Sequence, residues 1–469
     1  MLDGIYLGTV TTKDGKKEVV YAKDRHLITI GPSGSGKSWL ITPNAAALNK
    51  SLLIIDPKGE IAAVTAAKRA KEFGKESVKI LNPFGVLTDT YPDMASCGFN
   101  PLATIDPNSE TFAEDCFTIA EAFVVERPEG RDAHWVESAR DLIATLIMWE
   151  CRDWPKRIGT MAAVRQTLGV PHDVKKKKKA KVDDAGGIPP ATTPPPTPTT
   201  EEVATLKKVL KLMGKLGNKA MRNKAERYMT GGNELLGVLA EARTQTQSLD
   251  SMRISDDLSK DGFRFEEMKE RITTVYLVLP AHELEKHNRW MRLMVASALR
   301  AMLQGPESEE VGRVLFILDE FANALGTMKS IEKSVSYARG YGLQLWFILQ
   351  DLTQLQNLYG KGWETFIAQR GALTAYAPQD LTTSRYLSEL CGNKTEYVRT
   401  VMEDLEKGEW KPSFKAESLP LFRGDDLMTM PMGEMLCMLQ GVPPRRIQVP
   451  PYWLTKYNDG LRKNPYYKS

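Results

Sequence analysis

The sequence predicts an α/β fold in which one sheet is split by a helical insertion. Strand-sized apolar runs alternate with helical segments in residues 27–81 and again in residues 271–440. Between them, residues 107–255 show helical spacing of apolar side chains and no strand-sized runs. We therefore expect a nucleotide-binding domain made from residues 1–104 and 256–469, interrupted by an all-α domain at 105–255.

A phosphate-binding motif follows the first buried strand. The stretch from Gly31 to Ser38 reads GPSGSGKS and fits G-x-x-x-x-G-K-[ST], with an apolar strand at 27–30 before it and a helix start at Lys37. Glycines let successive backbone N–H groups point at one centre, and the helix N-terminus adds partial positive charge. The predicted ATP-binding residues are Gly31, Pro32, Ser33, Gly34, Ser35, Gly36, Lys37 and Ser38. Lys37 is expected to reach the β- and γ-phosphates, and Ser38 to ligate Mg²⁺.

A second motif ends a later strand. Val314–Leu318 is an apolar strand followed by Asp319 and Glu320, and ligands of open α/β sheets gather at that end of the strands. We expect Asp319 to hold Mg²⁺ and Glu320 to polarise the attacking water. Gln350 ends the next strand, where two interpretations stay open: a contact to the γ-phosphate or water, or an ordinary polar strand end.

Two further groups of residues are candidates with open alternatives. Arg339 either neutralises phosphate charge in a neighbouring subunit or satisfies a helix C-terminus, and Arg370 is the second such candidate. With a RecA-like strand order, Asp56 and Glu60 are expected beside the phosphate loop, where they either orient Mg²⁺ or the loop, or form a structural turn.

Composition limits the function classes. The net charge is +4, but six lysines at 175–179 and 181 account for it, and without them the balance is −2. Global charge therefore does not by itself indicate nucleic-acid binding. The five cysteines lack metal or disulfide spacing, and no apolar run reaches membrane-helix length. The sequence predicts a soluble chain, with any membrane attachment supplied by a partner or by a segment outside it.

Local signals outside the motifs predict four further features. Residues 1–23 read as a β-rich entry, and Pro43 is expected to kink or shorten the helix after the phosphate loop. The Lys- and Pro-rich segment 172–200 cannot bury a core and is expected to be disordered. From Pro450 the aromatic, Lys-rich tail is expected to be a surface extension.

Beyond single motifs, the order of several blocks resembles one family, the type IV secretion coupling proteins, or TraG-like conjugative DNA-transfer ATPases. The blocks are Gly31–Ser38 with Pro43-Asn44, Asp56-Pro57-Lys58-Gly59-Glu60, Asn82-Pro83-Phe84, Phe99-Asn100-Pro101-Leu102, 274–280, Leu318-Asp319-Glu320-Phe321, Leu349-Gln350-Asp351-Leu352, Trp363-Glu364-Thr365-Phe366 and Ala377-Pro378-Gln379-Asp380.

This resemblance implies a RecA-like P-loop ATPase domain with an inserted all-α domain, assembled as a homo-hexameric ring. It implies ATP-driven recruitment and pumping of DNA, single- or double-stranded, or of a relaxase–DNA complex or protein effectors, toward a secretion channel. Arg339 falls where the family keeps its arginine finger. The all-α domain would face DNA and cargo.

Family members usually carry transmembrane helices before the ATPase region. The resemblance therefore implies a position at the cytoplasmic face of a bacterial inner membrane, with an anchor that was removed or is provided by a partner. Two alternatives remain: another DNA translocase of the same superfamily, or a nucleotide-gated cargo adaptor with little motor activity.

Overall fold

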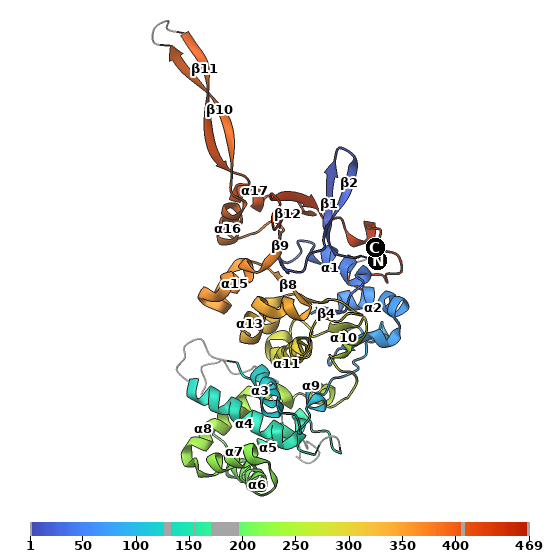
Figure 1. The fold of residues 1–469 in the computed structure, drawn as a ribbon, viewed down its shortest axis with the longest axis vertical. Coiled ribbons are helices and arrows are strands. Elements are labelled where there is room, and N and C mark those ends of the chain that lie inside the picture. Colours follow the sequence, from blue (N-terminus) through green and yellow to red (C-terminus); the bar gives the residue numbers. More distant parts are fainter. Residues whose placement is uncertain (1, 126–132, 154–155, 170–196, 405–408, 467–469) are drawn as a thin grey trace, which may run out of the picture.

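The computed structural model describes residues 2–125, 133–153, 156–169, 197–404 and 409–466. Its centre is an eleven-stranded sheet with the order β2-β1-β13-β12-β9-β3-β8-β7-β4-β6-β5 (Figure 1). The strands from β9 to β5 run parallel, whereas the pairs from β2 to β9 are antiparallel. The strand bounds are β1 Ile5–Thr12, β2 Gly15–Tyr21, β3 His26–Ile30, β4 Leu52–Ile55, β5 Val78–Leu81, β6 Thr274–Leu277, β7 Val314–Leu318, β8 Leu343–Leu349, β9 Arg370–Ala375, β12 Glu434–Leu439 and β13 Arg445–Gln448.

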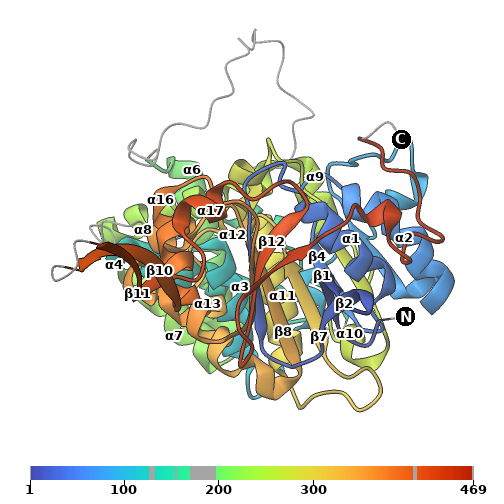
Figure 2. The same cartoon turned by 90° about the horizontal axis from the view of Figure 1, so that it is seen from above.

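The parallel strands are buried on both faces, which explains why they read as continuous apolar runs. Alternate residues of one strand enter two different cores. Leu27 packs in a core with α1 (Lys37–Ala47) and α2 (Glu60–Phe73), whereas Ile28 and Ile30 pack in a core with α11 (Leu284–Leu303). The sheet is thus covered by helices on both faces, as predicted for an α/β fold (Figure 2).

The second core continues into the helical insertion, which forms the lower end of the molecule in Figure 1. Its helices are α3 Phe112–Phe123, α4 Ala133–Cys151, α5 Met161–Thr167, α6 Thr200–Leu216, α7 Lys219–Thr230, α8 Gly232–Gln245 and α9 Met252–Asp257. The two ends of the insertion lie together, because Phe99 N–H donates to the Asp257 carbonyl at 3.0 Å. Asn100 Nδ2 also donates to Gly159 O inside the insertion, at 2.9 Å.

Short helices fill the loops around the sheet: α10 Glu267–Glu270, α12 Phe321–Leu325, α13 Lys329–Tyr337, α14 Leu352–Tyr359, α15 Trp363–Ala368, α16 Leu381–Cys391 and α17 Gly424–Met428. None of the helices within the described residues has the length and apolarity that crossing a bilayer requires.

Several local expectations differ from the structure. Helix α1 continues four residues beyond Pro43, to Ala47. Most of the predicted disordered segment, 172–196, lies outside the described residues, but its last residue, Thr200, begins α6 behind a Thr199–Glu202 capping box. The tail after Pro450 is not a free extension, because Tyr452 and Tyr457 are buried. The ring centroids of Tyr457 and Tyr6 are 5.6 Å apart.

A long hairpin was not predicted at all. Strands β10 (Asn393–Asp404) and β11 (Glu409–Pro420) pair with each other alone and project from the body of the molecule (Figure 1). Tyr397 and Phe414 on it are 73% and 66% exposed.

Candidate nucleotide-binding and hydrolysis site

Four neighbouring parallel strands bring the predicted chemical groups to one edge of the sheet. β3, β8, β7 and β4 are adjacent in that order, and they end at Ile30, Leu349, Leu318 and Ile55. The next residues are therefore the phosphate loop, Gln350, the Asp319–Glu320 pair and Asp56. The loop is anchored to this edge because Gly31 N–H donates to Leu349 O at 2.9 Å.

The loop has the backbone conformation that its glycines permit. Gly34 and Gly36 have φ values of +79° and +94°, in the left-handed region that favours glycine. Gly36 precedes α1 without any side-chain cap, and the first turn of α1 contains no acid. The first amides of α1 are thus free to bind an anion, which the helix dipole favours.

Two side chains of the loop are poised for phosphate. Lys37 Nζ donates to Gly31 O at 2.7 Å and to Pro32 O at 3.1 Å, so the ammonium group lies folded over the loop. Ser35 Oγ is buried and has no hydrogen-bond partner among the described residues. Ser33 is exposed, and Ser38 lies partly exposed in the first turn of α1. The Lys37 ammonium and the serine hydroxyls of the loop are groups that can bind a triphosphate.

Glu320 is held by three neighbours and an unusual backbone. Its φ of +49° is in the left-handed region, which costs a non-glycine residue about 1 kcal/mol or more. Its Oε2 accepts from Gln350 Nε2 at 2.8 Å and from Asn323 Nδ2 at 3.0 Å, and its Oε1 lies 4.0 Å from Lys37 Nζ. The structure thus brings Lys37, Glu320 and Gln350 together at this edge of the sheet.

Three carboxyl groups lie close together behind this network. The pKa of Asp319 is raised to about 7, mainly because its carboxyl group is buried and secondly because the charge of Glu320 repels it. The pKa of Asp56 is also raised to about 7, mainly by burial of its carboxyl group and to a smaller extent by the charges of Glu60 and Asp319. Asp56 is therefore a neighbour of Asp319 on the adjacent strand and not, as predicted, of the phosphate loop, which is three strands away.

The donor set fits a magnesium ion that is bound mainly through its nucleotide. Among the described residues no group of three or more His, Cys, Asp or Glu side chains is arranged to hold a metal. Mg²⁺ commonly takes only one or two protein groups and completes its shell with phosphates and water. The Ser38 hydroxyl and the Asp319 carboxylate are such groups, and a cation there would favour the ionised form of Asp319.

The two arginine candidates lie at the opposite edge of the sheet. Arg339 belongs to the short 3₁₀ turn Ala338–Tyr341, which precedes β8, and its side chain is 51% exposed with Nε 3.7 Å from Asp24 Oδ2. The seven residues of β8 separate it from Gln350 by about 20 Å. Arg370 begins β9 at the same edge and donates to Ile367 O at 2.6 Å. Neither reaches the phosphate loop of its own chain.

Sequence reasoning missed two residues at the site. Asn323 donates to the Glu320 carboxylate. Its position three residues after Glu320, one helical turn on, is the sequence feature that could have indicated this contact. Tyr376 follows β9 and lies against the loop: its hydroxyl donates to Gly36 O at 3.3 Å, and a Cβ at Gly31 would come within 2.9 Å of its ring. No sequence signal placed Tyr376 there.

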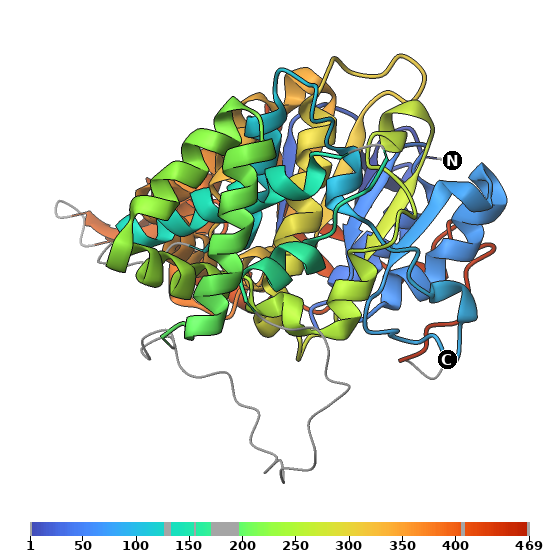
Figure 3. The same cartoon turned by 90° about the horizontal axis from the view of Figure 1, so that it is seen from below.

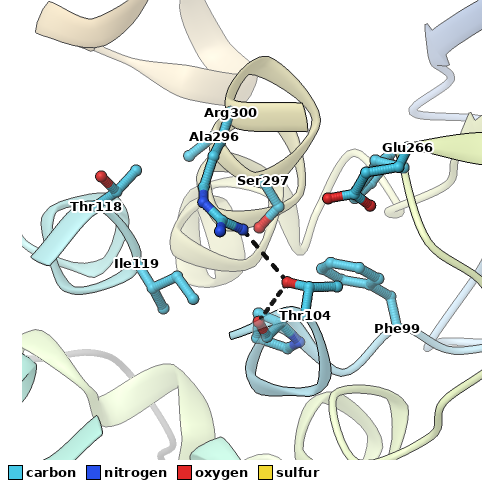
Figure 4. A pocket seen from close by; sticks show the side chains of 10 residues that line it. Phe99, Thr104, Thr118, Ile119, Glu266, Ala296, Ser297 and Arg300 are labelled. Atoms are coloured by element: carbon cyan, nitrogen blue, oxygen red, sulfur yellow. Dashed lines mark hydrogen bonds between the residues drawn. The ribbon is translucent and has the colours of Figure 1, made fainter. Parts of the chain in front are cut away.

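A pocket elsewhere in the chain is structural. Figure 4 shows it where α3 and α11 meet, with Arg300 pointing to Thr104; its volume of about 10 Å³ is enough for one water molecule at most. Arg300 also donates to Asp115 Oδ1 at 2.7 Å, so it joins α11 to the insertion.

Comparison with known proteins places the chain in a family. The family model described as type IV secretory system conjugative DNA transfer matches residues 2–464. The chain belongs to this family. Among curated relatives, a conjugal transfer protein TraG of Escherichia coli is 23% identical over 451 residues, covering 91% of this chain and 65% of the relative. A TraG of Rhizobium radiobacter is 26% identical over 431 residues, covering 90% and 61%. The chain thus spans less than two thirds of the length of these relatives.

Solved structures of a conjugative coupling protein share the fold. TrwBΔN70 in its unbound form gives a TM-score of 0.64 at 17% identity, covering 92% of this chain and 86% of that one. TrwB with ADPNP gives the same TM-score and identity. The predicted fold class, a RecA-like P-loop ATPase domain with an inserted all-α domain, is therefore confirmed for this member of the conjugative DNA-transfer family.

Proposed function

We propose that this protein is an ATP-hydrolysing coupling protein that recruits DNA, or a relaxase–DNA complex or protein effectors, and pumps it to a type IV secretion channel. One observation carries the enzymatic part. The Lys37 ammonium and the Gln350 amide converge on the Glu320 carboxylate at the mouth of a phosphate loop. TrwB has been solved in complex with ADPNP, and with ADP and Mg²⁺, which supports ATP and Mg²⁺ as ligands here.

Each residue has a separate role in the proposed reaction. The amides from Gly31 to Ser38 and the Lys37 ammonium hold the phosphates, and Ser38 and Asp319 hold Mg²⁺, which would neutralise phosphate charge. Glu320 accepts the proton of the water that attacks the γ-phosphorus, while the bond to the β–γ bridging oxygen breaks and ADP leaves. Gln350 keeps the Glu320 carboxylate in position.

Arg339 completes the site from a neighbouring subunit in this proposal. Its guanidinium is exposed and lies about 20 Å from its own Gln350, so it reaches a γ-phosphate only across an interface. A homo-hexameric ring, as in RecA-like motors, provides such interfaces. We further propose that attachment to the inner membrane runs through an anchoring segment or partner.

The cations of α6 and α7 support DNA as the cargo. Residues 200–230 contain eight Lys or Arg and three Glu. Seven of these cations are exposed, and none is ion-paired to another residue that the structure describes: Lys207, Lys208, Lys211, Lys215, Lys219, Arg222 and Arg227. These helices cover the end of the insertion (Figure 3, green). Clustered unpaired cations favour binding of a phosphate backbone.

The proposal is tested by measuring ATP hydrolysis of the purified chain with Mg²⁺, with and without single- and double-stranded DNA, together with its oligomeric mass. We expect hydrolysis that DNA stimulates and a mass that rises toward a ring. Absence of hydrolysis under every DNA condition would refute the enzymatic part.

A further inference from the structure

An aromatic pair lies beside the phosphate loop, and the nucleotide chemistry described above does not use it. Trp39 is the residue after Ser38, and Trp453 belongs to the C-terminal segment. Their ring centroids are 5.8 Å apart with planes at 80°. Two residues more than 400 positions apart are thus brought together at the first turn of α1.

The Trp39 ring is fixed against the loop. A Cβ at Gly36 would lie 3.3 Å from Trp39 Cε3, and one at Gly433 would lie 3.7 Å from Trp39 Cζ3. The backbone amide of Trp39 donates to Gly36 O at 2.9 Å, which ties the first turn of α1 to the loop. The indole therefore forms one wall of the loop mouth and is held from two sides.

Trp453 is presented by a well-anchored turn. Tyr452 before it is buried, and the Tyr452 and Trp453 rings are 5.0 Å apart. Asn458 Nδ2 donates to Trp453 O at 2.6 Å. Trp453 itself stays 45% exposed, and its neighbour Leu454 is 72% exposed. A half-exposed indole on an anchored turn suits a ligand with a flat apolar face.

The order of the strands around β3 indicates which part of a bound nucleotide would lie beside the two tryptophans. In the proposed mechanism the γ-phosphate lies toward Glu320 and Gln350, and these residues follow β7 and β8 on one side of β3. The base must leave the loop on the other side, toward β9 and β12. Gly433, which directly precedes β12, contacts Trp39 on that side.

From this geometry we infer that Trp39 and Trp453 form the nucleobase-binding wall of the site, with the C-terminal segment supplying the stacking ring. The inference rests on the proposed nucleotide function and names a subsite of it. Each indole offers a π face that any base can stack on, so the wall favours binding of the base without selecting it strictly.

The test compares two ligands that differ in the base. ATP and inorganic tripolyphosphate, each with Mg²⁺, are titrated against the full chain and against Trp453→Leu, which keeps an apolar side chain for packing. We expect Trp453→Leu to weaken ATP about tenfold and to leave tripolyphosphate unchanged, because only ATP uses the ring. Quenching of tryptophan emission by ATP should also diminish in this variant.

A matched control separates stacking from loss of the tail. Tyr466→Phe removes the bond from the Tyr466 hydroxyl to Lys58 O at 2.7 Å in the same segment and keeps Trp453. It should bind both ligands as the unmodified chain does. Equal weakening of both ligands by Trp453→Leu, no weakening of either, or the same ATP loss in Tyr466→Phe would overturn the inference.

The proposed nucleotide function fails in a different way. Lys37→Ala should weaken both ligands, since both use the phosphate loop. An unmodified chain that binds neither ligand would refute the nucleotide site itself, whereas normal binding with no effect of Trp453→Leu would refute only the base wall.

Discussion

At the scale of single residues, Glu320 combines a costly backbone with well-satisfied side-chain contacts. Its left-handed φ of +49° is stabilised because Gln350, Asn323 and Lys37 all approach its carboxylate. Strained positions of this kind persist where the surroundings determine the geometry, and they concentrate at functional sites. This supports Glu320, more than Asp319, as the group that activates water.

Replacing Glu320 by Gln should separate binding from chemistry. The amide keeps the size of the side chain but cannot accept a proton, so we expect kcat for ATP hydrolysis to fall about 100-fold or more while the Kd for ATP changes little. Steady-state ATPase assays and equilibrium titrations measure the two quantities. Glu389→Gln, at an exposed position of α16, is the control, and it should hydrolyse ATP normally. A Glu320→Gln variant with unreduced kcat would remove this residue from the mechanism.

Motif residues were predictable because their chemistry is encoded in a few adjacent positions. Asp319, Glu320 and Gln350 directly follow strands that the apolar runs before them define, and Lys37 and Ser38 begin the helix after the phosphate loop. Residues whose role depends on strand order were not predictable. Asp56 was expected beside the phosphate loop, but two strands, β8 and β7, lie between β4 and β3.

At the scale of elements, the periodicity of apolar residues predicted the buried strands and the amphipathic helices. It did not predict elements that are exposed or that tertiary contacts stabilise. The side chains of the β10–β11 hairpin at 393–399 and 414–420 are mostly exposed, so its strands lack the apolar pattern of a buried strand. Pro43 was expected to disturb α1, but Asn44 Nδ2 donates to Leu40 O and Tyr6 O while Asn44 Oδ1 accepts from Tyr6 N–H. These contacts to β1 hold the helix on both sides of the proline, and propensity alone cannot show them.

The helices α6 and α7 allow a charge test of the proposed DNA surface. Reversing Lys208, Lys211 and Lys215 to Glu should weaken DNA binding. The negative slope of log Kobs against log salt should become smaller in magnitude by about 2 to 3, since each lost phosphate contact removes nearly one unit. Fluorescence anisotropy with a labelled oligonucleotide over a salt series measures both. Basal ATP hydrolysis should not change, because these lysines lie on the insertion.

Reversal of Lys13, Lys16 and Lys23 is the matched control, because these residues are exposed and the net charge changes equally. It should leave most of the affinity and the salt slope in place. Equal losses in the two triple variants would mean that total charge, and not the α6–α7 surface, attracts DNA.

At the scale of the whole molecule, the sheet separates two halves of one proposed catalytic site. Glu320 lies beyond the carboxyl ends of the strands, and Arg339 lies before the amino end of β8. Sequence alone left Arg339 as either a finger or a helix-end contact, because its distance from the phosphate loop depends on the fold. The opposite-edge position keeps Arg339 away from the phosphate loop of its own subunit, so the proposed finger would act between subunits.

Mixed oligomers test this arrangement. Arg339→Ala should bind ATP normally and lose most hydrolysis, because an arginine finger contributes about 10³-fold or more to phosphoryl transfer. Lys37→Ala should lose nucleotide binding but keep its own Arg339. When the two variants are mixed, an Arg339→Ala subunit can receive the guanidinium of a Lys37→Ala neighbour, so ATPase activity should reappear and depend on the mixing ratio. Arg385→Ala, at an exposed position of α16, controls for loss of positive charge and should stay active. Failure to recover activity at any ratio, in oligomers shown to contain both variants, would contradict a finger acting between subunits and leave Arg339 as a surface residue paired loosely with Asp24.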